Sequence, residues 1–295
     1  MKYILVPTDF SACAEYAVEA AAKLAKKFNA IVYLFHNVYL PAHLEELSEA
    51  QKEKDVEVLQ TLQNAEILLT ATKEKFFKTL AFPVVTRGNL IANIQDIVKT
   101  KHIDMLVMGS HGASGKNEFF IGSHTQKVVR MVHCPVLVLK EPLKKLDFDS
   151  IAYASNLNLD ERNSMVVAKD FIKHFLPKEI HLLTIHTSEF FGGAYMIEQA
   201  AMDDCAKIFK PFKVKNHIYR DFTVGGGIQN FVAVKQPDLL IVSNHNRHPL
   251  KRMLIGSNVE TLINHVDVPV LSIDYEVEPV PEDIRELTNL GQRTR

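Results

Sequence analysis

Short apolar runs alternate with longer amphipathic segments along the whole chain. The runs have the length of strands, and the segments between them repeat apolar residues at helical spacing. This alternation is typical of a parallel sheet covered by helices on both faces. It predicts strands in the first half at 2–7, 30–37, 82–86, 104–109 and 135–140, and in the second half at 150–155, 179–186, 214–219, 238–243 and 269–274.

The segments between the strands predict helices, which in the first half are expected at 11–28, 43–79, 89–101 and 122–133. In the longest of them, from His43 to Thr79, apolar residues recur at helical spacing between Glu and Lys, and we interpret it as one long amphipathic helix. The glycines at 225–227 do not form a dinucleotide-binding GxGxxG pattern, because Asn230 stands where the last glycine is needed. They indicate a flexible turn between a strand and a helix.

The chain contains an internal repeat. Residues 104–109 match residues 238–243 at an offset of 134, and Gly122-Ser123 matches Gly256-Ser257 at the same offset. A chain of 295 residues is also long enough for two domains with separate cores.

The repeat predicts where the domains end. The first domain is expected at 1–143 and the second at 148–276, joined by a short polar linker, and 277–295 are expected to form a charged C-terminal tail.

Composition narrows the class of protein. The 34 Lys and Arg residues and the 35 Asp and Glu residues give a net charge of −1. The chain therefore lacks the excess of positive charge that would attract nucleic acid or anionic lipid. Cys13, Cys134 and Cys205 are far apart and lack the spacing of a zinc or redox motif. No apolar run reaches the roughly 18 residues that a membrane helix needs. We expect a cytoplasmic protein without nucleic-acid or membrane partners.

Glycine and small polar residues gather where the fourth predicted strand ends, in the loop 109–116, and Gly122-Ser123 then opens a helix. Glycines let the backbone approach an anion closely, and a helix N-terminus favours negative charge. The loop is not a Walker motif, because Ser110 and Asn117 stand where that motif needs Gly and Ser or Thr. The loop indicates a phosphate site at the carboxyl edge of the sheet.

The spacing Gly109-x2-Gly112-x9-Gly122-Ser123 resembles the G-x2-G-x9-G-[S/T] motif of nucleotide-binding members of the universal stress protein family. The segments 4–11 and 134–139 are similar to that family as well. Through the repeat, the resemblance extends to the second half, as in tandem universal stress proteins. It implies two tandem Rossmann-like, adenine nucleotide alpha hydrolase-like α/β domains, each with a five-stranded parallel sheet and helices on both faces.

The same resemblance implies a site for ATP with Mg²⁺. Asp9 would meet the ribose and the phosphate-bound metal, which makes it the candidate metal ligand, and the backbone at Asn37 would meet the adenine. The implied nucleotide-binding set is Pro7, Thr8, Asp9, Asn37, Gly109, His111, Gly112, Gly122, Ser123, His124 and Thr125. Two structural alternatives stay open, in which Asp9 and Ser123 are N-caps of the helices that follow them.

The second half has lost most of this set. Ser243 and Asn246 replace Gly109 and Gly112, and Asn156 replaces Asp9. We therefore expect one nucleotide site per chain. Gly256-Ser257 is retained, which keeps open a site for a small anion at the start of the helix that follows. The loop with His245 and His248 is interpreted as exposed to solvent.

No catalytic residue can be assigned from spacing, and the pattern favours a nucleotide-dependent switch or scaffold in stress adaptation over an enzyme. A slow Mg²⁺-dependent ATPase and an interaction protein whose second domain binds a partner are the alternatives. The resemblance also implies an internal pseudo-dimer through residues 136–140 and 270–274, with a homodimer as a further possibility, while the sequence names no protein partner.

Overall fold

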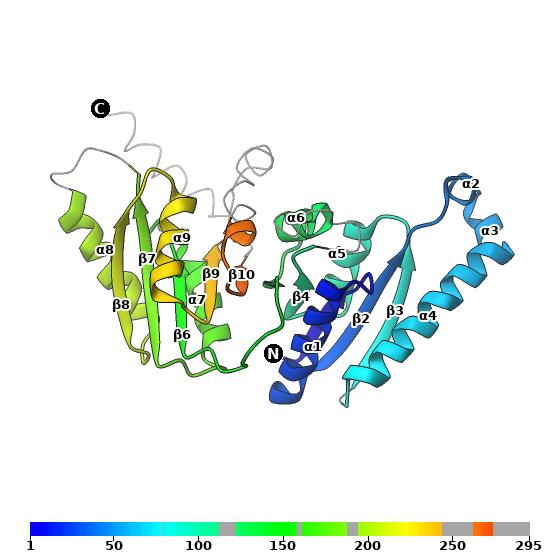
Figure 1. Ribbon diagram of the computed structural model, residues 1–295, viewed down its shortest axis with the longest axis horizontal. Helices are drawn as coiled ribbons and strands as arrows, with labels where there is room; N and C mark the ends of the chain where they lie inside the picture. Colours follow the sequence, from blue (N-terminus) through cyan, green and yellow to red (C-terminus); the bar gives the residue numbers. More distant parts are fainter. Residues whose placement is uncertain (79, 112–121, 158–160, 188–193, 244–261, 274–295) are drawn as a thin grey trace, which may run out of the picture.

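The computed structural model describes residues 1–78, 80–111, 122–157, 161–187, 194–243 and 262–273. Strands and helices alternate through both halves, as Figure 1 shows. The strands are β1 (Tyr3–Pro7), β2 (Ile31–Val38), β3 (Ala81–Arg87), β4 (Met105–Gly109), β5 (Val136–Leu139), β6 (Ser150–Ala154), β7 (Glu179–His186), β8 (Val214–Arg220), β9 (Leu239–Ser243) and β10 (Val270–Ile273). The helices are α1 (Ala12–Phe28), α2 (Ala42–Glu45), α3 (Glu49–Lys52), α4 (Val56–Phe76), α5 (Leu90–Thr100), α6 (Ser123–Met131), α7 (Glu161–Ile172), α8 (Ala194–Ile208) and α9 (Val224–Lys235).

The described strands form one sheet in the order β3-β2-β1-β4-β5-β10-β9-β6-β7-β8. Strands within each half pair in parallel, and the halves meet where β5 and β10 pair antiparallel, with Leu137 opposite Leu271. This confirms the predicted α/β class with five parallel strands in each half. The last strands of the two halves are therefore adjacent.

Two apolar layers cover the sheet. On one face, α1, α4, α7 and α8 bury side chains in one cluster that runs through both halves. On the other face, α5, α6, α9 and residues 262–266 bury a second cluster. Helix α1 lies close to the strands because the side chains that it buries are mostly small, at Ala17, Ala20, Ala21 and Ala25.

An aromatic cluster joins the two halves beside the linker. Phe28 at the end of α1 meets Phe175 after α7 with ring centroids 5.3 Å apart, and Phe148, directly after the linker, meets Phe175 at 4.8 Å. Lys27 pairs with Asp147 at 2.7 Å next to these rings. Because Phe148 is fully buried, this contact is part of the core and holds the linker in place.

The prediction of one helix over 43–79 is wrong. The segment forms α2, α3 and α4, because polar residues inside it begin new helices. The Ser48 N–H donates to Gln51 Oε1 before α3, and Asp55 Oδ1 accepts from the N–H groups of Glu57 and Val58 at the start of α4. Short polar side chains that bond to nearby backbone compete with helix continuation, and here they end it.

The interpretation of residues 225–227 as a flexible turn is also wrong, because they lie in the first turn of α9. A Cβ at Gly227 would stand 2.6 Å from Ile185 Cγ2, and one at Gly226 would stand 2.8 Å from Asp221 Oδ1. At Gly226 and Gly227, close packing of α9 on the end of β8 and on β7, not backbone flexibility, therefore favours glycine.

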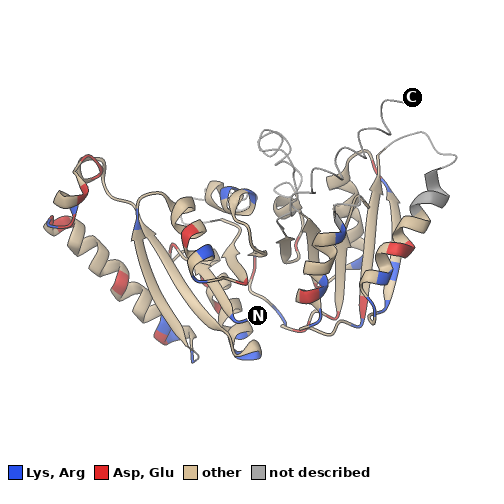
Figure 2. Cartoon of the chain, turned by 180° about the vertical axis from the view of Figure 1, so that it is seen from behind, with Lys and Arg blue, Asp and Glu red and all other residues tan. Residues whose placement is uncertain are grey.

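Charge is distributed evenly over the described residues. Lys and Arg are interspersed with Asp and Glu on the helices of both halves in Figure 2. This agrees with the near-zero net charge of the sequence. Among the helices that the structure describes, none has the length and apolar character required to cross a bilayer.

Two histidines form a hydrogen-bonded pair beneath α9. His181 Nδ1 lies 2.9 Å from His217 Nε2, and the ring of Phe231 packs on both imidazoles. His181 Nε2 lies 3.1 Å from Glu179 Oε1, with Lys215 and Lys235 also nearby. Burial lowers the pKa of His217 from 6.5 to about 4 and also lowers the pKa of His181. Two neutral imidazoles can form this bond, because one nitrogen donates and the other accepts. If both rings were protonated, two N–H donors would face each other and the bond would be lost.

This pair is expected to make the protein less stable in acid. Because the folded state holds His217 neutral, its stabilising contribution is complete above about pH 6.5 and is lost as the pH falls toward about 4. We expect a loss of about 1–2 kcal/mol from the pair, reduced by its partial solvation. Urea unfolding at pH 7 and pH 4.5 measures it. The His217→Gln variant, which keeps a polar group without titrating, should lose less, and equal losses in both proteins would contradict the prediction.

Candidate functional site

A cavity of about 490 Å³ opens at the carboxyl ends of β1, β2 and β4. All the residues of the predicted nucleotide-binding set that the structure describes line it. They are Pro7, Thr8, Asp9, Asn37, Gly109, His111, Gly122, Ser123, His124 and Thr125. Gly112 lies outside the described residues. The carboxyl edge of an open parallel sheet is where such folds bind ligands, so the position of the cavity fits a binding site.

A tight turn after β1 presents Asp9 to the cavity. The Phe10 N–H donates to Thr8 Oγ1 at 3.0 Å, and the Ser11 N–H donates to Asp9 Oδ1 at 3.1 Å. Phe10 has a φ of +63°, and its ring packs 4.7 Å from that of His36. Because both bonds and the ring contact fix the turn, the exposed Asp9 carboxylate is held in one place.

The alternative in which Asp9 caps the first helix is wrong. Ser11 is the N-cap of α1, since its hydroxyl accepts from the Ala14 N–H at 3.2 Å. Asp9 lies two residues earlier, in the turn. Its carboxylate is therefore not the group that satisfies the first turn of the helix.

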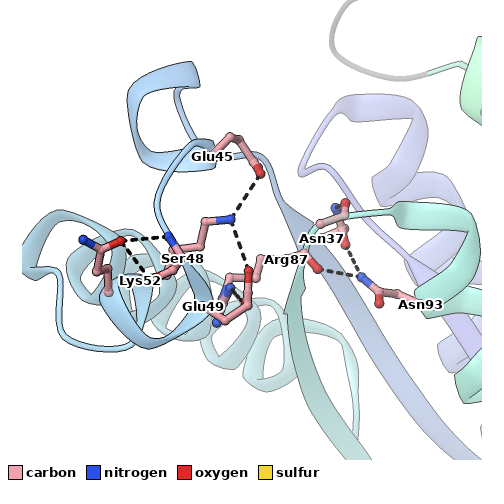
Figure 3. A network of polar contacts seen from close by, with 9 residues as sticks. Asn37, Glu45, Ser48, Glu49, Lys52, Arg87 and Asn93 are labelled. Atoms are coloured by element: carbon pink, nitrogen blue, oxygen red, sulfur yellow. Dashed lines mark hydrogen bonds and ion pairs between the residues drawn. The ribbon is translucent and has the colours of Figure 1, made fainter.

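The side chain of Asn37 takes part in a polar network within the protein (Figure 3). Its Oδ1 accepts from Thr86 Oγ1 at 2.9 Å and from Asn93 Nδ2 at 2.8 Å, and its Nδ2 donates to the Gly88 carbonyl at 3.0 Å. The network ties the end of β2 to β3 and to the first turns of α5. It fixes the backbone of Asn37 at the cavity wall.

A second polar cluster in Figure 3 holds the helices that follow β2. Lys52 is buried and its ammonium contacts Glu45 and Glu49, while Arg87 at the end of β3 bonds to Glu49. The bonds from Arg87 and Lys52 lower the pKa of the Glu49 carboxyl. The cluster attaches α2 and α3 to the edge of the sheet beside the cavity.

Gly109 is a packing residue as well as a cavity residue. A Cβ there would stand 2.7 Å from the Cys13 carbonyl oxygen and 2.8 Å from Cys13 Sγ, both in the first turn of α1. Its carbonyl accepts from the buried Thr125 hydroxyl at 3.0 Å, which ties α6 to β4. The Thr125 hydroxyl thus has a structural partner.

The described residues on either side of 112–121 bond to each other, and α6 begins there without a side-chain cap. The Gly122 N–H donates to the Ser110 carbonyl at 2.7 Å, and Ser110 Oγ bonds to His111 Nδ1 at 3.0 Å. Gly122 is the N-cap of α6, and no side chain caps this helix among the described residues. The first-turn N–H groups at the exposed Ser123 and at His124 therefore have no side-chain cap, on residues that line the cavity, and such groups are suited to donate to an anion. Because Gly122 is the N-cap, the alternative in which Ser123 is the cap is wrong.

Two aromatic rings meet across the mouth of the cavity. Tyr39, after β2, stacks on His124 with ring planes 7° apart and centroids 5.7 Å apart. The Tyr39 hydroxyl lies 3.2 Å from His124 Nε2, and partial burial raises the pKa of Tyr39. Sequence reasoning assigned His124 but missed Tyr39, although its place two residues beyond Asn37 at a strand end was an available signal.

Sequence reasoning also missed the wall that α4 contributes. Thr61, Asn64, Ala65 and Leu68 all line the cavity. Their spacing of three, four and seven residues places them on one face of the helix. This wall was missed because 43–79 was interpreted as an outer helix with one face on the sheet. The polar residues Thr61 and Asn64, next to apolar residues on the same face, were the available signal.

The second half repeats the turn that holds Asp9, but an uncharged residue takes the place of the aspartate. The Leu157 N–H donates to Ser155 Oγ at 2.9 Å and Leu157 has a φ of +61°, which reproduces the turn around Phe10. The Ser155 N–H donates to the Leu183 carbonyl, as the Thr8 N–H donates to that of Phe35. Asn156 thus occupies the position of Asp9. The loop that contains Asn246, Gly256, Ser257, His245 and His248 lies outside the described residues.

The architecture is that of a Rossmann-like α/β protein of the adenine nucleotide alpha hydrolase type. The universal stress protein family model matches residues 1–140 and 185–273, which is more than half of the chain. The chain belongs to the universal stress protein family, and it carries two tandem domains of that family.

Individual relatives agree with this assignment. Universal stress protein MJ0531 of Methanocaldococcus jannaschii is 30% identical over 152 residues, which cover 49% of this chain and 85% of the relative. Universal stress protein YxiE of Bacillus subtilis is 30% identical over 153 residues, which cover 46% of this chain and 97% of the relative. A solved universal stress protein from Archaeoglobus fulgidus covers 93% of this chain and 98% of its own, with a TM-score of 0.69 and 19% identity, and so shares the fold.

Proposed function

We propose that the protein binds ATP with Mg²⁺ at one site, in its first half, and acts as a nucleotide-dependent switch or scaffold in stress adaptation. The observation that carries the proposal is the cavity at the strand ends. One of its ends is mainly apolar, and the other combines the fixed Asp9 carboxylate with the open N-terminus of α6. A nucleotide has the same division between an apolar base and anionic phosphates.

The base is assigned to the end of β2. The carbonyl of Phe35 bonds toward β1, and alternate residues of a parallel strand bond to opposite neighbours. Asn37 therefore directs its backbone N–H and C=O toward the side on which β1 has already ended at Pro7. Adenine needs a donor for its N1 atom and an acceptor for its N6 amino group. The backbone N–H and C=O of Asn37 supply this donor and this acceptor. The apolar residues around it are Val38, Ala65, Leu68, Leu90 and Ile94.

The phosphates are assigned to the first turn of α6. The N–H groups of this turn and the Ser123 hydroxyl are donors for phosphate oxygens. Asp9 supplies oxygen acceptors for the ribose hydroxyls or for a hydrated Mg²⁺, whose preferred ligands are carboxylate and water oxygens. Mg²⁺ would neutralise part of the phosphate charge at this position.

The stoichiometry of bound nucleotide tests the proposal. Purified, Mg²⁺-supplemented protein is denatured, the released nucleotide is identified by mass spectrometry, and ATP is titrated calorimetrically. We expect one ATP per chain. Two per chain would mean that Ser243 and Asn156 do not impair the second half, and no released ATP together with no heat would overturn the nucleotide site.

The switch has a separate test. A ligand shifts a conformational equilibrium only through different affinities for the two states. We therefore expect ATP to change protease sensitivity or self-association of the full chain, and no change in either would contradict the switch. Single-turnover hydrolysis above background that is lost in Asp9→Ala would instead indicate a slow ATPase.

The cellular setting is part of the same proposal. Cys13, Cys134 and Cys205 are all buried and form no disulfide with one another, which supports a reducing compartment such as the cytoplasm. The antiparallel pairing of β5 with β10 supports an internal pseudo-dimer of the two domains. We propose boundaries at 1–143 and 148–276, on either side of the linker.

A further inference from the structure

Helix α4 forms the wall of the cavity at its base end. It packs against β2 and β3, whereas the phosphate end lies at β4 and α6. Ala65 belongs to the same buried cluster as Val38, which directly follows Asn37. The neighbouring Asn64 lines the same cavity, and through Ala65 it belongs to the part of the wall next to the end of β2.

Asn64 is chemically distinct on this wall. The cavity is lined by two side-chain amides within the described residues, and that of Asn37 bonds to Thr86, Asn93 and Gly88. The Thr61 hydroxyl donates to the Glu57 carbonyl at 2.7 Å. The side chain of Asn64 makes no hydrogen bond to any residue that the structure describes, so its donor and its acceptor are both available to a ligand.

We propose that Asn64 reads the N6/N7 edge of adenine through a two-point hydrogen bond and thereby selects adenine over guanine, an inference that rests on the proposed ATP site. Asn64 Oδ1 accepts one hydrogen of the N6 amino group, and Nδ2 donates to N7. This is the pairing that asparagine makes with adenine wherever that edge is exposed. The second N6 hydrogen stays available for the Asn37 carbonyl, so both edges of the base are read.

Guanine does not satisfy the same arrangement. It presents two acceptors, O6 and N7, on that edge, so Asn64 Oδ1 would face O6 lone pairs or the amide would turn and keep one bond. A polar group that the bound base covers and leaves without its partner costs more than the bond contributes. The discrimination therefore comes from a single side chain that neither composition nor motif spacing identifies.

The test compares ATP with 7-deaza-ATP, which lacks only the N7 acceptor. Calorimetric affinities are measured for the wild-type protein, for Asn64→Leu and for the control Gln63→Leu, in which the adjacent exposed amide of α4 is changed outside the cavity lining. We expect the wild type and Gln63→Leu to bind ATP about tenfold more tightly than 7-deaza-ATP. In Asn64→Leu the ratio should fall to about one, and the preference for ATP over GTP should narrow with it.

Each outcome is decisive. Equal affinities of the wild type for the two nucleotides, or a tenfold ratio that persists in Asn64→Leu, would overturn the role of Asn64 and leave the ATP site standing. A wild-type protein that binds no ATP overturns the proposed function and this inference together. Asn64→Asp guards against a packing effect, because it keeps the size and the acceptor, loses the N7 donor, and should also remove the preference for ATP over 7-deaza-ATP.

Discussion

Replacing Gly109 with alanine is expected to destabilise the protein by about 2–4 kcal/mol and to weaken ATP binding severely. The new Cβ would meet the Cys13 carbonyl oxygen at 2.7 Å and the Cys13 carbonyl carbon at 2.8 Å. These are backbone atoms of α1, so they cannot turn aside as a flexible side chain can. Helix α1 must move from β4, which also displaces the turn that holds Asp9. Urea unfolding and calorimetric ATP titration measure the two effects.

A second substitution tests whether backbone or side chain causes the loss. The new Cβ would also stand 2.8 Å from Cys13 Sγ, so Cys13→Ala in the Gly109→Ala background removes that contact alone. We expect little recovery, because the backbone clash remains. Full recovery would show that the thiol, not the close approach of α1, makes glycine necessary.

Replacing Asp9 with asparagine is expected to weaken binding of Mg²⁺-ATP about 10- to 100-fold with stability almost unchanged. Asparagine keeps the oxygen that accepts from the Ser11 N–H, so the turn is preserved. The second half folds the same turn with Asn156 in this position, and Leu157 there has the same positive φ. Only the charge that we propose meets the ribose or Mg²⁺ is lost. Calorimetry with and without Mg²⁺, together with thermal unfolding, separates binding from folding.

The reciprocal change is the matched control. Asn156→Asp restores the charge in the second half while Ser243 still stands in place of glycine. We expect the stoichiometry to remain one ATP per chain. Unchanged affinity in Asp9→Asn, or a second ATP bound by Asn156→Asp, would contradict the assigned role of this position.

The strands could be read from the sequence almost residue by residue. Apolar runs such as 104–109 and 238–243 correspond to β4 and β9, because a strand buried on both faces tolerates little else. The antiparallel meeting of the halves could not be read from periodicity, which says nothing about the order of strands in a sheet. A contact between residues 136–140 and 270–274 was expected only through the family resemblance, and its antiparallel direction was not predicted.

The helices after β2 show where pattern reasoning fails. Ser48 and Asp55 are polar residues in a charged segment, and nothing in their spacing separates a solvated helical position from a helix start. The same limit applies at Gly227, where glycine answers a contact with Ile185 that only the folded chain creates.

Part of the candidate site could be predicted from the sequence. Asp9, Gly109 and Gly122 could be found because they lie in loops at strand ends, where spacing is informative. Tyr39 and Asn64 were missed because their place in the cavity depends on how α4 and the end of β2 pack together.

The β5–β10 ladder also determines how the protein responds to dilution. In a pair of separate chains, such a contact forms only at concentrations above its dissociation constant. Here a linker of a few residues, anchored by Phe148, keeps the two strands at a high effective concentration. The half with Asp9 therefore always stands beside the half with Asn156, in a fixed ratio that neither expression level nor exchange between chains can alter.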